Sequence, residues 1–273
     1  MSGLEYSGRL SGDRLGFVQS WVELLALPVA LLVSLLLRGA LIGRLLLVPV
    51  QLQFHELGHV ALAWLSGRAA LPLPFGVTFW REKQSVVAAC GVAFMLSLLL
   101  QRALRERRLI GAAVALFFVL LFLLLAVVLP AEHSRMLVLA GGVGGELVLT
   151  SLVIVAFYLP LPDRLRWEFF RFVLLLPAVA CWLAAVELWV RVWRGTRSFP
   201  IGTVLGTPGD GSDDLARLIS EFQLDELALS GLFGRLSLFT VACVALTYGV
   251  RALLAVRALR PLHRFSARGG PLV

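Results

Sequence analysis

The chain has 273 residues, of which 59% are hydrophobic and only 15% are charged, and its mean hydropathy is +0.88. Ordinary soluble domains contain about 45–50% apolar and about 25% charged residues, so this composition excludes a disordered chain, a soluble globular enzyme and a small disulfide scaffold. The net charge of +8 comes from short arginine clusters at the ends of apolar runs, which is typical of membrane flanks and argues against a nucleic-acid partner. We therefore expect an all-α polytopic membrane protein whose main partner is the lipid bilayer.

Residues 1–20 are polar and lack the basic start, short apolar stretch and cleavage site of a signal peptide, so we expect insertion to rely on the first hydrophobic segment. A transmembrane helix needs about 20 mostly apolar residues. Segment 86–100 is shorter than this, which is compatible with a tilted or re-entrant piece. The sequence predicts six or seven transmembrane helices, at residues 21–37, 45–65, 86–100, 109–130, 136–158, 172–190 and 236–256.

The basic residues indicate the membrane orientation only weakly. If all seven segments cross, the loops at 38–44, 101–108 and 159–171 share one side of the membrane with the C-terminal tail. This side holds a slight majority of the arginines and lysines, so the positive-inside rule favours it as the cytoplasmic side by a small margin.

Two segments between the predicted spans have a character of their own. Residues 66–85 contain prolines and a glycine and then alternate in polarity, which predicts a short β-hairpin. Residues 191–235 are polar and rich in glycine and proline, and they continue with apolar residues at helical spacing, which predicts a short amphipathic helix. The chain thus divides into a polar segment 1–20, a transmembrane core 21–190, the polar segment 191–235, and a last span with a basic tail at 236–273.

The predicted span at 45–65 contains the motif His55-Glu56-Leu57-Gly58-His59. On a helix, two histidines four residues apart leave the same face one turn apart, so both imidazoles can reach one metal ion. Glu56 lies beside this pair, close enough to contact a metal-bound water. Such polar residues are costly within an apolar segment and usually mark a functional site. The sequence therefore predicts a metal site, with Zn2+ as the cofactor, His55 and His59 as ligands and Glu56 as the catalytic base.

Other residues near the motif have less specific interpretations. Gln51 lies one turn before His55 and is either a supporting partner of the metal site or part of a helix–helix hydrogen bond. Gly141 and Gly142 belong to a glycine run that would let a second helix or a substrate strand approach the metal closely. Glu146 follows this run inside a predicted span, and an intramembrane carboxylate is a candidate for the site.

A catalytic zinc site needs a third protein ligand in addition to the two histidines. For Glu82 the sequence favours the interpretation as a solvated charge, because this residue lies in a polar loop beside other charged residues. Asp213 and Asp214 follow Ser212, where acids at the start of a helix are also explained by capping and by the helix dipole. The candidates outside the motif are Glu82, Glu132, His133, Glu146, Asp210, Asp213 and Asp214.

Three stretches of the chain resemble the site-2 protease family of intramembrane metalloproteases. The motif at 55–59 matches that family's metal motif, including the glycine before the second histidine. Residues 140–145, Ala-Gly-Gly-Val-Gly-Gly, resemble its A-G-P-x-x-N element, with glycines in place of the proline and the asparagine. Residues 208–211, Pro-Gly-Asp-Gly, followed by Ala-Arg-Leu-Ile at 216–219, resemble its P-x-x-D-G-x-R-L-L signature, whose aspartate completes the zinc site.

The resemblance implies a membrane-embedded zinc metalloprotease that hydrolyses peptide bonds in or near the transmembrane segments of membrane-protein substrates. For the third ligand it favours Asp210, which keeps the Asp-Gly pair, and then Asp214, which keeps the better spacing to residues 216–219. Asp213 fits a variant of the signature or a helix cap. The alternative is a membrane metal-binding protein without protease activity, either a transporter or a catalytically decayed scaffold, which the altered element at 140–145 favours.

Overall fold

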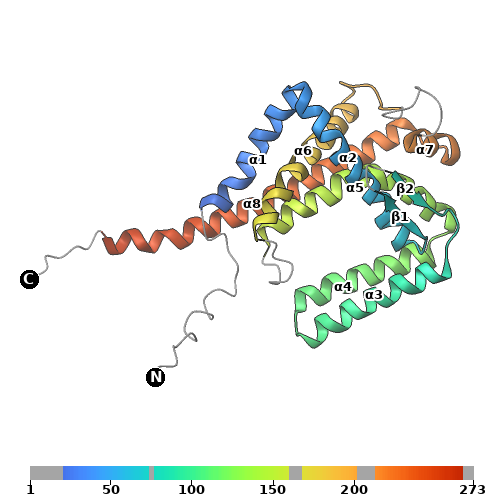
Figure 1. The fold of residues 1–273 in the computed structure, drawn as a ribbon, viewed down its shortest axis with the longest axis horizontal. Helices are drawn as coiled ribbons and strands as arrows, with labels where there is room; N and C mark the ends of the chain where they lie inside the picture. The colour runs from blue at the N-terminus through green and yellow to red at the C-terminus, as the bar shows by residue number, and fades with distance from the viewer. Residues whose placement is uncertain (1–20, 74–76, 160–167, 202–212, 267–273) are drawn as a thin grey trace, which may run out of the picture.

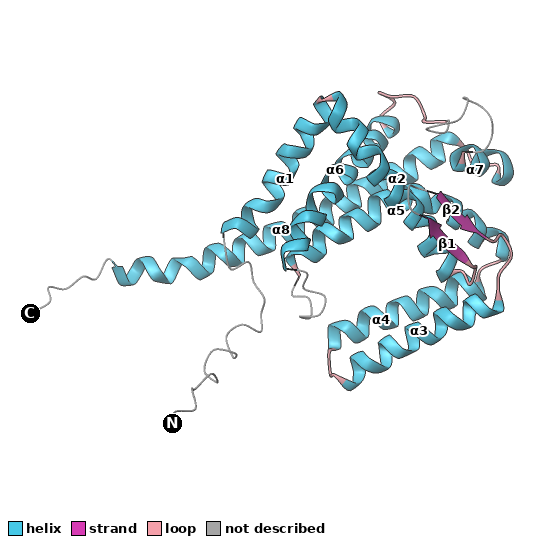
Figure 2. Cartoon of the chain, viewed as in Figure 1, coloured by secondary structure: helices cyan, strands magenta, loops and turns pink. Residues whose placement is uncertain are grey.

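The computed structural model describes residues 21–73, 77–159, 168–201 and 213–266. Within these ranges the chain forms eight α-helices, one two-stranded sheet and a π-helical turn, which confirms the predicted all-α class (Figures 1 and 2). In chain order the elements are α1 (Trp21–Gly39), α2 (Leu41–Leu65), β1 (Ala70–Leu73), β2 (Val77–Trp80), α3 (Val86–Arg105), α4 (Leu109–Leu123), the π-helical turn η2 (Leu124–Val128), α5 (Ala131–Tyr158), α6 (Glu168–Trp193), α7 (Asp214–Phe222) and α8 (Glu226–Ser266).

Six of the described helices are long and apolar enough to cross a membrane, so the expectation of six or seven spans is met with six. The segment predicted at 86–100 is longer than the sequence indicated, because α3 continues for 20 residues. α2 has 25 residues but is not one of the six, since polar side chains interrupt it between Gln51 and His59. The six candidate spans are Val22–Gly39, Val86–Arg105, Leu109–Val128, Ala131–Tyr158, Phe169–Trp193 and Glu226–Ala255.

The predicted hairpin after α2 is formed by β1 and β2. The two strands are antiparallel, with Ala70 opposite Trp80 and Leu73 opposite Val77. Its tip, residues 74–76, lies outside the described residues, as do the polar segment 1–20 and residues 202–212. The strand β2 lies beside the metal-motif helix, because the hydroxyl of Thr78 donates a hydrogen bond to the backbone oxygen of Glu56 at 3.4 Å.

The predicted amphipathic helix is α7, and it packs onto the bundle with its apolar face. Leu215 and Leu218 are buried in a cluster with Leu147 of α5, Trp189 of α6 and Phe233 of α8. α5 is the central helix of this arrangement, since more than half of its span is buried inside the protein and it contacts α2, α6, α7 and α8. α3 and α4 pack mainly on one another and project beside the bundle (Figure 1).

Arg68 joins the segment after α2 to the beginning of α5. The side chain is 1% exposed, and its guanidinium donates hydrogen bonds to the backbone oxygens of Glu82 at 2.9 Å and Ala131 at 2.7 Å and to the hydroxyl of Ser134 at 2.8 Å. A buried charge of this kind is tolerated only when its donors are satisfied. The three bonds therefore fix where α2 ends relative to the first turn of α5.

Replacing Arg68 by leucine should destabilise the fold. The variant loses three charge-assisted hydrogen bonds that join the end of α2 to the first turn of α5, so we expect a loss of about 3 kcal/mol in the free energy of unfolding. The measurement is the thermal unfolding midpoint of the purified protein in detergent. Arg81→Leu is the matched control, because Arg81 is exposed; equal midpoints for the two variants would contradict the anchoring role of Arg68.

Candidate metal centre

The site begins with an unusually close crossing of α2 and α5, made by glycines. A Cβ atom added to Gly145 would lie 2.5 Å from the Cα of Gly58 and 2.7 Å from the backbone oxygen of Phe54. One added to Gly58 would lie 2.0 Å from the backbone oxygen of Gly141. Real Cβ atoms do not come this close to backbone atoms, so the crossing requires glycine on both helices.

The close crossing brings α5 within hydrogen-bonding reach of both histidines of α2. The Nδ1 atom of His55 lies 2.8 Å from Oε1 of Glu146, and the Nδ1 atom of His59 lies 2.7 Å from the backbone oxygen of Val138. A carboxylate and a carbonyl oxygen only accept hydrogen bonds, so each Nδ1 carries a proton and donates it. Both rings therefore direct Nε2 to the opposite side, where it is available to bind a cation.

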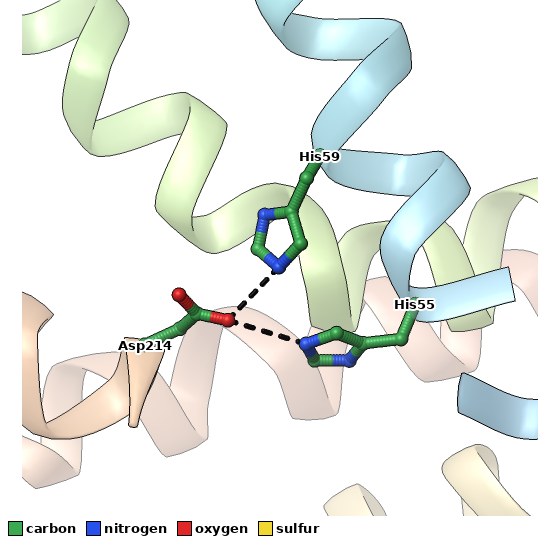
Figure 3. A group of neighbouring side chains, drawn as sticks. All are labelled: His55, His59 and Asp214. Carbon is green, nitrogen blue, oxygen red and sulfur yellow. Dashed lines mark hydrogen bonds and ion pairs between the residues drawn. The ribbon is translucent and has the colours of Figure 1, made fainter. Parts of the chain in front are cut away.

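Asp214 completes the group from α7. Its Oδ2 atom lies 2.9 Å from Nε2 of His59 and 3.3 Å from Nε2 of His55. The three side chains come from helices that are far apart in the sequence, yet their ligand atoms all lie within 4.8 Å of one another (Figure 3). The sequence favoured Asp210 over Asp214 as the third ligand; Asp210 lies outside the described residues, and Asp214 is the aspartate that the structure brings to the histidines.

Local capping explains why Asp214 and not Asp213 faces the histidines. The side chain of Asp213 accepts a hydrogen bond from the backbone nitrogen of Leu215 at 3.2 Å, so it is the N-cap of α7, one of the two roles that the sequence offered for it. Asp214 is then the first helical residue. With Leu215 and Leu218 buried against the bundle, the carboxylate of Asp214 points toward α2.

An ion-pair network holds the outer side of α7. Arg217 pairs with Glu221 at 2.7 Å and with Glu82, in the segment after β2, at 3.3 Å. Arg135 of α5 pairs with the same two acids, at 3.3 Å from Glu82 and at shorter range from Glu221. Glu82, for which the sequence favoured a solvated charge, is exposed but paired. The network thus joins α7 to α5 and to the hairpin segment.

The electrostatics of the group favour a bound cation. Burial alone raises the pKa of Asp214, but the hydrogen bonds that His55 and His59 direct at its carboxylate hold that pKa well below its usual range. A neutral imidazole with its proton on Nδ1 presents a lone pair at Nε2, which repels a carboxylate oxygen. The close approach of both Nε2 atoms to Asp214 therefore requires positive charge between them, from protons or from a metal ion.

The donor set and the space around it fit a zinc ion. Two imidazole nitrogens and one carboxylate oxygen are ligands that zinc takes, at about 2.0–2.2 Å, which puts neighbouring ligand atoms roughly 3.3 Å apart. The distances from Asp214 to the two histidines lie near this value. Gly142 faces the rings: a Cβ atom on it would lie 2.6 Å from Nε2 of His59 and would also overlap His55. Because Gly142 has no side chain, the ligand nitrogens of the two histidines can occupy this space.

Glu146 contacts the Nδ1 side of His55 and is not part of the group that could hold a metal ion. Its carboxylate is buried, with Oε1 next to the Nδ1 of His55 and Oε2 accepting a hydrogen bond from Nε2 of Gln51 at 2.9 Å. The sequence offered two interpretations of Gln51, a supporting partner of the metal site or a helix–helix hydrogen bond. Both apply, because Gln51 bonds to α5 across the helix pair and the same Glu146 carboxylate contacts His55. Thr150, one turn further along α5, donates to the backbone oxygen of Glu146.

Glu56 lies next to the histidines with its carboxylate available. Its backbone oxygen accepts the bond from Thr78, whereas its side chain is half-buried and makes no hydrogen bond or ion pair to any described residue. The remaining candidates, Glu132 and His133, are exposed in the first turn of α5. Sequence reasoning missed Val138 and Arg68: the former contributes a backbone oxygen, which has no sequence signature, and the latter follows α2 without any motif.

No protein-family model, no curated protein and no solved structure matches this chain. What can be said of its class therefore comes from its own fold and site. Within the described residues, these define an all-α protein with six candidate membrane spans and a partly buried His55–His59–Asp214 group that could hold a metal ion.

Replacing Gly142 by alanine should abolish metal binding. The added methyl group overlaps both imidazoles, so they must rotate away from Asp214, and we expect the affinity for zinc to fall by at least ~100-fold. Gly144→Ala is the matched control, since a Cβ atom there meets nothing within 4 Å. Both changes raise helix propensity equally. Chelator competition on purified protein measures the affinities, and equal zinc binding by the two variants would refute the location of the site.

Replacing Glu146 by glutamine should weaken zinc binding without removing it. Glutamine keeps the shape of the side chain but loses the charge that orients His55, and such changes behind a metal ligand typically cost about 10–100-fold in affinity. Glu132→Gln, on the exposed first turn of the same helix, should bind zinc as the parent protein does. An unchanged affinity for the Glu146 variant would mean that its carboxylate does not orient the ligand.

Proposed function

We propose that the protein is an integral membrane zinc metalloprotease of the site-2 protease type, which hydrolyses peptide bonds in or near transmembrane segments of membrane proteins. The observation that carries this proposal is the convergence of His55, His59 and Asp214, with Glu56 next to His55 in the sequence. Three protein ligands leave a zinc ion one position for water, which is the arrangement of catalytic rather than structural zinc sites.

A zinc ion bound in such a site polarises a carbonyl group and lowers the pKa of a bound water to about 7. The protein supplies the proton transfer. Glu56 accepts the proton of the attacking water at its carboxylate and returns it to the amine nitrogen that leaves. Its lack of a competing ion pair within the described residues keeps the carboxylate ready for this role.

The remaining residues orient these groups. Glu146 and the backbone oxygen of Val138 hold the two imidazoles by their Nδ1 atoms, so that Nε2 is the nitrogen that binds metal. Gly142 leaves the space that the two imidazole rings occupy. Cleavage requires an extended substrate backbone, so the substrate is a transmembrane segment that unwinds locally or the extended chain next to one.

One observation favours a second candidate, a membrane metal-binding protein without protease activity. The resemblance to the site-2 protease family places a polar residue at position 145, but Gly145 packs against Gly58 at the helix crossing. No side chain fits there, so this position cannot contact a substrate. A transporter or a scaffold would need the metal group but not the free carboxylate of Glu56.

Replacing Glu56 by glutamine separates the two candidates. Glutamine cannot take a proton from water, so we expect peptide cleavage to fall by at least ~100-fold while the zinc content stays the same. The assay uses purified protein in detergent with single-span membrane-protein substrates, and bound zinc is measured on the same samples. Glu226→Gln is the control, because Glu226 is exposed in the first turn of α8.

Zinc binding without cleavage by the unmodified protein would favour the metal-binding candidate. Equal cleavage by the Glu56 variant and its control would overturn the assignment of Glu56 as the base.

A further inference from the structure

We propose that four charged residues that meet on the outer side of α7, Glu82, Arg135, Arg217 and Glu221, position Asp214 as a metal ligand. They act on the metal centre only through the place in which they hold α7, so they are positioning residues and not ligands. The inference rests on the proposed function for the identity of the ion. It makes that function more specific, because it states which contacts decide whether the third ligand is in place.

Asp214 differs from the two histidines in the way it is held. The histidines lie on α2, whose backbone touches α5 where Gly58 meets Gly145. Asp214 is instead the first residue of α7, a helix of nine residues. Isolated helices shorter than about 12–15 residues are marginal in water. The position of Asp214 therefore depends on the contacts that dock α7 on the rest of the protein.

The apolar contacts of α7 decide which face is buried but do not fix the helix fully. Of its nine residues only Leu215 and Leu218 are buried, with Ile219 and Phe222 packed beside them. These side chains share one face of the helix, and apolar contacts are non-directional. A small roll of α7 would keep this face buried and would still move the Asp214 carboxylate away from the imidazoles. Metal–ligand distances, in contrast, are fixed to within about 0.2 Å.

The four charged residues supply directional contacts, and they form a closed ring of alternating sign. Oε1 of Glu82 lies 3.3 Å from Nη2 of Arg135 and 3.3 Å from Nη2 of Arg217. Glu221 closes the ring, because its Oε1 lies 2.7 Å from Nε of Arg217 and its Oε2 pairs with Arg135. The guanidinium of Arg135 also lies 5.6 Å from the centroid of the Phe222 ring. The ring therefore joins α7 to two other elements at once.

Two members of the ring belong to the part of the protein that also holds a histidine. The backbone oxygen of Glu82 accepts a hydrogen bond from the buried Arg68, which bonds to the first turn of α5 as well. Arg135 lies on α5, one turn before Val138, whose backbone oxygen contacts Nδ1 of His59. The ring thus ties α7 to the same stretch of α5 that orients this imidazole.

The other two members move together with Asp214. Arg217 follows Asp214 by three residues and Glu221 follows Arg217 by four, so the three side chains lie along one side of α7. The ion pairs of Arg217 and Glu221 with the rest of the protein therefore fix the roll of the helix. With the roll, they fix the direction of the Asp214 carboxylate.

These contacts are needed because the site itself opposes docking before a cation binds. With neutral imidazoles, the Nε2 lone pairs of His59 and His55 face Oδ2 of Asp214 at 2.9 and 3.3 Å. Contacts elsewhere on α7 must offset this repulsion. The apparent affinity for a metal ion is the intrinsic affinity reduced by the fraction of molecules in which α7 is docked. The ring therefore sets metal affinity from outside the site.

The expected size of the effect is moderate. The side chain of Glu82 is 58% exposed, and a single exposed ion pair shifts an equilibrium by about five-fold at most. Glu82→Gln removes two such pairs, so we expect the zinc affinity to fall about 10-fold. The substitution keeps the backbone oxygen that Arg68 binds, so the anchor of this segment stays intact.

A comparison of Glu82→Gln in two backgrounds tests the proposal. Zinc affinity is measured by chelator competition on the purified full chain in detergent, for Glu82→Gln, Asp214→Asn and the double variant. We expect the loss of about 10-fold in the parent protein and less than about 2-fold in the Asp214→Asn background, because the ring acts only through Asp214. Equal losses in the two backgrounds would overturn the proposal.

Glu106→Gln is the matched control. Glu106 also pairs with two arginines, Arg102 at 2.8 Å and Arg108 at 2.9 Å, but it lies between α3 and α4, away from α7 (Figure 1). We expect this variant to bind zinc as the parent protein does. A loss as large as that of Glu82→Gln would show a general effect of surface charge and would refute the positioning role.

Trypsin cleavage after Arg217 gives a second reading that does not use zinc affinity. In the metal-free protein, Glu82→Gln should increase this cleavage several-fold over Glu106→Gln, and added zinc should suppress it; mass spectrometry of the fragments measures both. Equal cleavage of the two variants would contradict the role of the ring in docking α7. Neither measurement uses peptide hydrolysis by the protein. A protein that shows both effects but cleaves no substrate would therefore count against the proposed function alone.

Discussion

The close approach of α2 and α5 is the constraint on which the rest of the site depends. Gly58 on one helix and Gly141 and Gly145 on the other let the backbones touch, and only then can His55 and His59 reach Glu146 and the backbone of Val138. Larger residues would add several ångströms of separation, which is more than a hydrogen bond tolerates. In a membrane, where apolar side chains gain little by burial against one another, such close contacts are also the main source of helix association.

The polar groups at this crossing form a set that is balanced only with a cation. Gln51 and His55 satisfy both oxygens of Glu146, and His59 is satisfied at Nδ1 by a carbonyl oxygen. What remains is two carboxylates and two imidazoles, which carry two negative charges when the imidazoles are neutral. A divalent ion neutralises this charge, whereas each uncompensated charge in a buried site costs several kcal/mol. The same hydrogen bonds that hold the imidazoles in place therefore favour positive charge between them, from protons or from a metal ion.

Much of this arrangement is predictable from the sequence, because it depends on local patterns. The apolar runs give the spans, the alternation after the second segment gives the hairpin, and the spacing of His55 and His59 gives their common face. The third ligand is not predictable in this way, because the sequence does not show which of Asp213 and Asp214 caps α7. The direction of the remaining aspartate depends on the packing of Leu215 and Leu218 against the bundle, which orients the helix. Nor does the length of α2 reveal its path, since contacts of distant residues such as Arg68 place its C-terminal end.

Asp214 links the metal centre to the docking of α7. The helix is held by its apolar face within the bundle and by the pairs of Arg135 and Arg217 with Glu82 and Glu221 outside it. A metal ion that binds Asp214 stabilises the docked helix, and by thermodynamic linkage the docked helix strengthens metal binding by the same free energy. The histidines, in contrast, are positioned by the α2–α5 crossing alone. The affinity of this group for a metal ion would therefore be divided between a rigid helix pair and the separate helix α7, and changes in the surface ion pairs would act on that affinity through α7.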